Sequence, residues 1–177
     1  MKKPGISFAI CTHNEGNYVK TLLVSLINFI INQSDSELFE IVIVDDNSTE
    51  PETLAALEMT RLFPFVRILK HELAGDYAAH KNFLIDQCQH DWILNLDADE
   101  ILSTEVLNIL PFIPTENPDV EAYWLPRINT VDGLTIADVR KWGWILTPSK
   151  KTTGKVVKRN TPEYELLKEF QLIQSEQ

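Results

Sequence analysis

Short apolar runs alternate with longer amphipathic segments along the first two-thirds of the chain. The runs are rich in Ile, Val and Leu and are bounded by polar or turn-forming residues, which is typical of buried β-strands. They cover residues 6–11, 40–44, 66–69 and 92–96. The amphipathic segments place apolar residues at helical spacing and predict helices over residues 18–31, 53–62, 76–88 and 103–110.

Strands that alternate with helices of this length form βαβ units. The predicted fold class is therefore α/β, a mostly parallel sheet with helices on both faces. Right-handed crossovers bring the carboxyl ends of such strands to one edge of the sheet, which is where ligands bind.

The last third of the chain has a different pattern. Residues 123–128 predict a fifth strand, which Pro126 places at an edge of the sheet. An Asp-Gly pair at 132–133 is typical of a hairpin turn. Residues 147–161 contain five basic residues and no acidic one, which predicts a mobile surface loop before a terminal helix that starts at Thr161.

The size and charge of the chain limit the kinds of ligand that it is expected to bind. A chain of 177 residues is the size of one domain, and a net charge of −10 argues against nucleic acid. An acidic protein that binds an anionic ligand needs a metal ion or a local basic cluster. We expect no transmembrane segment, because no stretch approaches about 20 apolar residues. Cys11 and Cys88 predict buried thiols in a reducing compartment, so the expected location is cytoplasmic.

Three polar clusters come directly after predicted strands, at residues 12–15, 45–48 and 97–100. A parallel sheet would bring all three to the same edge, although they are far apart in sequence.

The third cluster contains two candidate metal ligands, Asp97 and Asp99. In an extended segment alternate residues point the same way about 6.5 Å apart, so both carboxylates could hold one hard cation. Mn²⁺ or Mg²⁺ prefers one or two carboxylates together with phosphate oxygens. The alternative is a solvated acidic turn.

The other two clusters each leave two interpretations open. Asp45 and Asp46 either accept a hydrogen bond from a base N–H, or they form part of a turn in which Asn47 or Ser48 caps the next helix. His13 stacks on a base or is an ordinary loop histidine.

The three blocks together resemble family 2 glycosyltransferases, over roughly residues 5–110 and in the family's order. Their sequences are ISFAICTHNE, IVIVDDNST and WILNLDADE. The segment DYAAHKN at 76–82 also resembles a helix from one branch of that family, where a basic residue precedes the asparagine. The resemblance implies a GT-A (Rossmann-like) fold.

The resemblance also implies roles for single residues. Thr12 and His13 would line the nucleobase pocket. Asp46 would accept a hydrogen bond from the base, which we expect to be uracil. Asp97 would contact the ribose or the water shell of the metal, and Asp99 would bind the metal. Lys81 would lie near the donor, the alternative being a solvated helix lysine. The predicted donor-binding residues are Thr12, His13, Glu15, Asp46, Lys81 and Asp97, and the predicted metal ligands are Asp99 and Asp97.

The catalytic residue is unknown from the sequence. Family members that invert the anomeric centre use a carboxylate base. Asp132, Asp138 and Glu163 are candidates, but the pattern around each favours a turn, surface or helix-capping residue. The basic loop is a lid over the diphosphate or a plain solvated segment.

We therefore predict a single domain over 1–177, with a nucleotide-sugar-binding half at 1–110 and a shortened acceptor half at 111–177. The predicted function is metal-dependent, inverting transfer from a nucleotide sugar, expected to be a UDP-sugar, to an unknown acceptor. The alternative is a nucleotide-sugar-binding module without a working base.

Overall fold

The computed structural model describes residues 4–116, 120, 122–126, 130–131, 134–135 and 143–148. The strands are β1 (Ile6–Thr12), β2 (Phe39–Asp45), β3 (Val66–Lys70), β4 (Trp92–Asp97), β5 (Tyr123–Pro126), β6 (Thr130–Val131), β7 (Leu134–Thr135) and β8 (Gly143–Pro148). The helices are α1 (Gly16–Ile31), the short 3₁₀ turn η1 (Ser36–Leu38), α2 (Pro51–Thr60), α3 (Tyr77–Gln87), α4 (Thr104–Ile109) and α5 (Ile113–Glu116).

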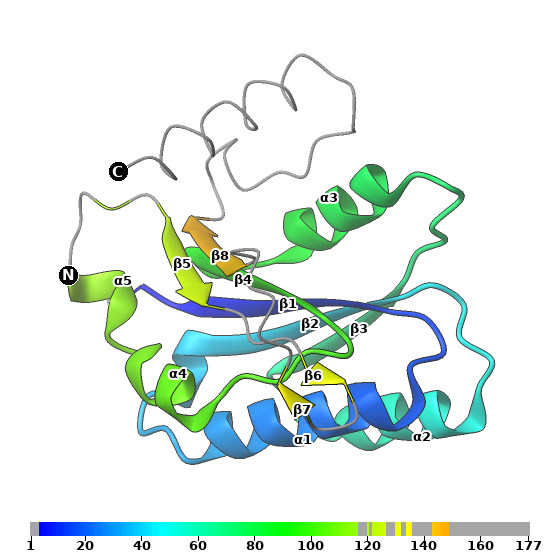
Figure 1. The fold of residues 1–177 in the computed structure, drawn as a ribbon, viewed down its shortest axis with the longest axis horizontal. Coiled ribbons are helices and arrows are strands. Elements are labelled where there is room, and N and C mark those ends of the chain that lie inside the picture. Colours follow the sequence, from blue (N-terminus) through cyan, green and yellow to red (C-terminus); the bar gives the residue numbers. More distant parts are fainter. Residues whose placement is uncertain are drawn as a thin grey trace.

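The main sheet has the strand order β3-β2-β1-β4-β8-β5. The first four strands of that order are mutually parallel, β8 pairs antiparallel with β4, and β5 pairs antiparallel with β8. Helices α1 and α2 lie on one face of the sheet and α3 on the other (Figure 1). The predicted α/β class, with helices on both faces, is confirmed.

Side chains point alternately to the two faces of the sheet along each strand, which explains why helices cover both faces. In β1, Phe8 and Ile10 pack into the larger core under α1, whereas Ala9 packs into a second cluster with Leu84 and Ile85 of α3. Successive side chains of a strand point to opposite faces, so a strand that is apolar on both needs a helix on each.

The chain reverses its direction across the sheet between β1 and β4. From β1 the strands proceed outward through β2 to β3, and the chain then returns to place β4 on the other side of β1. Thr12 is level with Asp45 of β2, and Cys11 is level with Asp97 of β4. The polar segments that follow these three strands therefore leave the sheet at the same edge, at its topological switch point.

Two elements predicted for the last third of the chain are present in the described residues. Residues 123–126 form the edge strand β5, as Pro126 indicated, and β6 pairs with β7 in a hairpin. The loop predicted over 147–161 is wrong at its start, because Thr147 and Pro148 pair with β4. Residues 149–161, the terminal helix, Asp132, Asp138 and Glu163 lie outside the described residues.

Both cysteines are half-buried rather than fully buried, and neither is in a disulfide. Burial raises the pKa of the Cys11 thiol to about 11, so this thiol is protonated at neutral pH. Within the part of the chain that the structure describes, no helix combines the length and the apolar character needed to cross a bilayer.

Candidate functional site

The polar segments at the carboxyl edge of the sheet surround one cavity of about 280 Å³. Asp46 and Asp97 open onto this same cavity, and so does Asp99. The lining residues are Cys11, Thr12, His13, Glu15, Asp46, Leu73, Tyr77, His80, Asp97, Ala98 and Asp99. Six of the seven predicted site residues are among them, and Lys81 lies just behind.

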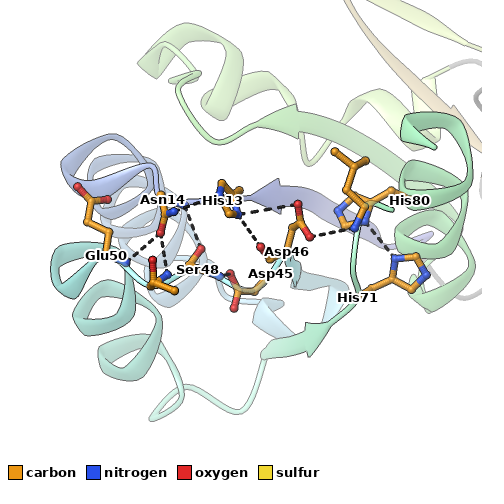
Figure 2. Close-up of polar contacts among 10 residues, drawn as sticks. His13, Asn14, Asp45, Asp46, Ser48, Glu50, His71 and His80 are labelled. Carbon is orange, nitrogen blue, oxygen red and sulfur yellow. Dashed lines mark hydrogen bonds and ion pairs between the residues drawn. The ribbon is translucent and has the colours of Figure 1, made fainter. Parts of the chain in front are cut away.

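Asn14 ties the segment after β1 to the segment after β2 (Figure 2). Its Oδ1 accepts from the backbone N–H groups of Thr49 and Glu50 at 2.8 and 2.9 Å, and its own N–H donates to Ser48 Oγ at 3.0 Å. Asn14 has a φ of 53°, a left-handed conformation that asparagine tolerates better than most residues. The clamp fixes the side of the cavity that carries Thr12 and His13.

These contacts also settle the helix-cap alternative. Ser48 Oγ accepts from Asn14, its backbone N–H donates to Asp45 Oδ1 at 3.0 Å, and α2 begins later, with Glu50 at its N-cap. The idea that Asn47 or Ser48 caps α2 is wrong. Asp45 is instead a buried turn residue that holds the loop presenting Asp46.

Asp46 lies between His13 and His80 in Figure 2. Its Oδ1 accepts from Leu73 N–H at 2.9 Å, and its Oδ2 is 3.8 Å from His13 Nδ1. His13 Nδ1 also lies 2.5 Å from the Asp46 carbonyl oxygen. The carboxylate is thus held in place by one backbone donor, with its second oxygen directed toward the His13 side of the cavity.

Asp97 and Asp99 are both exposed, while Ala98 and Glu100 are buried. The extended geometry that we predicted for this segment is wrong, because Glu100 N–H donates to the Asp97 carbonyl at 3.0 Å and closes a turn. Glu100 Oε2 in turn accepts from Asp97 N–H at 2.9 Å. The turn still directs both aspartates to the cavity, and Glu100 stabilises it from inside.

Lys81 reaches Asp97 from α3 and is buried, with its side chain 4% exposed. Its Nζ is 2.8 Å from Asp97 Oδ1 and 3.0 Å from Asn95 Oδ1. Burial alone would lower the pKa of Lys81, but Cys11 and Asp97 outweigh it and raise the pKa above its ordinary value. The alternative of a solvated helix lysine is wrong. Lys81 is a buried cation that fixes one oxygen of Asp97.

The open side of the cavity is acidic. Burial, followed by the neighbouring Asp99 carboxylate, raises the pKa of Glu15. Glu15, Asp97 and Asp99 therefore give this rim a negative charge, which would repel an anionic ligand.

Leu73, Tyr77 and His80 line the cavity but were not predicted as site residues. They come from the loop and helix that follow β3, a strand whose end carries no obvious acidic cluster. The parallel topology was the usable signal, since it brings the end of β3 to the same edge. Tyr77 also donates toward Asp97 Oδ1 at 3.5 Å.

A cavity at the switch point of a mostly parallel sheet, with a carboxylate pair at its rim, is typical of enzymes that bind nucleotides. Comparison with known proteins agrees. The family model "Glycosyl transferase family 2" matches residues 7–164, which is most of the chain. The protein belongs to glycosyl transferase family 2.

Individual relatives are similar over part of their length. The lipopolysaccharide core biosynthesis glycosyltransferase LpsC of Rhizobium meliloti is 31% identical over 129 residues, covering 71% of this chain and 43% of LpsC. The uncharacterized glycosyltransferase RC0292 of Rickettsia conorii is 36% identical over 108 residues, covering 61% of this chain and 33% of that protein. The chain thus spans less than half the length of these relatives.

Two solved structures share the fold. S. aureus TarS 1–349 in complex with UDP-GlcNAc superposes with a TM-score of 0.61 at 24% identity, covering 76% of this chain and 37% of TarS 1–349. The mannosyltransferase PcManGT of Pyrobaculum calidifontis, in complex with GDP-Man and Mn²⁺, gives 0.54 at 19% identity, covering 69% of this chain and 35% of PcManGT. At these identities the likeness supports the GT-A fold that the sequence predicted.

Proposed function

We propose that this chain binds a UDP-sugar through a divalent metal ion and transfers the sugar, with inversion, to an acceptor. The observation that carries the proposal is the convergence of the segments after β1, β2 and β4 on one cavity. Family membership supports glycosyl transfer as the reaction.

The base would lie between His13 and Asp46. Asp46 Oδ1 is already engaged by Leu73 N–H, so Oδ2 is the oxygen that meets the ligand. A single acceptor suits the one N–H of uracil better than the two adjacent N–H groups of guanine, which favour a bidentate carboxylate. Thr12 Oγ1 is buried at the cavity and has no hydrogen-bond partner among the described residues, so it supplies a further polar contact for the nucleotide.

The residues at the rim fit a hard cation. Among the described residues no three His, Cys, Asp or Glu side chains converge as a complete metal site. Asp99, with Asp97 beside it, instead provides the small number of carboxylate oxygens that Mn²⁺ or Mg²⁺ takes when diphosphate oxygens complete its shell. Such a cation would offset the charge that develops on the departing diphosphate.

A nucleotide-binding titration tests the proposal. We expect UDP-GlcNAc to bind the wild-type chain in the presence of Mn²⁺, and to bind at least about tenfold more weakly after EDTA treatment. GDP-Man serves as the comparison ligand. Equal binding with and without Mn²⁺ would contradict the metal role, and a preference for GDP-Man would contradict the choice of base. Binding without turnover across an acceptor panel would favour the alternative, a nucleotide-sugar-binding module.

Lys81→Met tests the ion pair behind the rim. Methionine fills most of the same buried volume, and the remaining carboxylate of Asp97 keeps its access to water because its side chain is 51% exposed. Asp97 would lose both its orientation and its neutralising partner beside the diphosphate. We therefore expect the same fold, by circular dichroism, and about tenfold weaker binding of UDP-GlcNAc with Mn²⁺. Lys20→Met, at an exposed position of α1, is the matched control and should bind as the wild type does.

A further inference from the structure

Two histidines face each other beside the cavity, and the proposed donor site does not use either charge. The Nδ1 atoms of His71 and His80 are 3.0 Å apart. His80 is only 2% exposed, and the ring of His71 stacks on Phe83 with the ring centroids 4.1 Å apart. The pair is therefore held by packing on both sides.

The contact between these two nitrogens limits the charge that the pair can carry. One Nδ1 must hold a proton and the other must present a lone pair. Both conditions are met when the two rings are neutral or when one is charged. When both rings are charged, two N–H groups oppose each other and the contact breaks.

One peptide group connects the pair to Asp46. His80 hydrogen-bonds the backbone of Glu72, and the next N–H along the chain, that of Leu73, donates to Asp46 Oδ1 at 2.9 Å. Because the peptide between Glu72 and Leu73 is planar and rigid, movement at His80 is transmitted to the donor that holds Asp46. Figure 2 shows the pair and Asp46 side by side.

The surroundings of His80 disfavour its charged form. Burial lowers the pKa of His80, and the charges of His71 and Lys81 lower it further. Asp46 and the Glu72 backbone act in the opposite direction, and the net result is a pKa below the ordinary histidine value. Double protonation of the pair requires His80 to be charged, and this needs a lower pH than the charging of an ordinary histidine.

We propose that the His71–His80 pair positions Asp46 through the Glu72–Leu73 peptide, so that protonation of both rings frees the carboxylate and weakens nucleotide binding. The inference rests on the proposed function for the role of Asp46. The positioning itself is a property of the ligand-free chain.

The amide of Leu73 tests the positioning without any ligand. In the wild-type chain its ¹H–¹⁵N resonance should shift between about pH 5 and pH 7, in step with the titration of the pair. His71→Phe retains the stack on Phe83 but removes one titrating ring, and should abolish that shift. His80→Gln gives the same result by a neutral replacement of the other ring. An unchanged Leu73 titration in the folded variants would overturn the proposal.

Nucleotide binding tests the consequence. UDP-GlcNAc is a suitable probe, because its diphosphate does not titrate in this range. We expect the wild-type chain to bind it about tenfold more weakly at about pH 5.5 than at about pH 8, and His71→Phe to show little change. His13→Gln, which removes the exposed histidine of the cavity, should retain the pH dependence, as should the distant His90→Gln.

The possible outcomes separate the two proposals. If His13→Gln abolishes the pH dependence of binding and His71→Phe keeps it, the His71–His80 pair does not cause that dependence. If the wild-type chain binds no nucleotide at about pH 8, the proposed donor site fails, and the Leu73 titration still decides the positioning.

Discussion

Asp99→Ala is expected to weaken Mn²⁺-dependent binding of UDP-GlcNAc at least a hundredfold. The side chain is exposed at the rim and lies in the turn after β4, with the buried Ala98 and Glu100 on either side. In the proposed site it is the direct metal ligand, because Asp97 already pairs with Lys81. Loss of that ligand would leave the negative diphosphate facing Glu15 and Asp97 without a cation between them.

The fold should not change in this variant. An exposed side chain outside the core contributes little to stability, so the thermal midpoint is expected to stay within about 2 °C of the wild type. Asp91→Ala is the matched control, since Asp91 is exposed at the opposite end of β4. If Asp99→Ala binds the donor with Mn²⁺ as tightly as Asp91→Ala does, the metal site is misplaced.

Strands β1, β2 and β4 were predictable because they are buried on both faces of the sheet. Such strands appear in the sequence as continuous apolar runs that stop at polar residues, as at Thr12, Asp45 and Asp97. At each of these residues the strand ends and a polar segment of the candidate site begins. That coincidence is why the sequence predicts the convergence of distant loops on one cavity.

Other features depend on contacts between distant residues. The helical position of Lys81 gave no indication of whether it is solvated, and only the packing of α3 on β1 and β2 buries it against Asp97. His71 comes directly after β3 and His80 lies in the first turn of α3, so no local pattern predicts their pairing. Strand β8 was missed because we assigned its last residues to a basic loop, although Trp144-Ile145-Leu146 is a short apolar run.

The second large effect concerns stability, at the end of the sheet opposite the cavity. Glu40 is 6% exposed and accepts from Ser7 Oγ at 2.6 Å and from Gln89 N–H at 2.5 Å. Arg67 pairs with its other oxygen at 2.9 Å and also donates to the Gln87 carbonyl. The carboxylate thus joins β1, β2, β3 and the connection from α3 to β4.

Glu40→Gln is expected to lower the free energy of unfolding by about 3 kcal/mol at neutral pH. The amide keeps the shape but removes the charge that balances Arg67, and it turns an N–H group toward one of the present donors. Chemical denaturation measures the difference. Glu58→Gln makes the same substitution in the exposed pair with Arg61, where the side chains are 77% and 52% exposed, and should change stability by less than about 0.5 kcal/mol.

The pH dependence of this difference separates the charge from the shape of Glu40. Burial raises the pKa of Glu40, but the hydrogen bonds from Ser7 and Gln89, together with Arg67, outweigh burial and leave the pKa below its ordinary value. A carboxyl group whose pKa is depressed by folding stabilises the protein above its unfolded pKa, and that stabilisation is lost as the pH falls through the folded pKa. Denaturation midpoints of wild type and Glu40→Gln should therefore converge below about pH 4.5. A difference that stays constant from neutral to acidic pH would mean that packing, and not the charge, accounts for the effect of Glu40.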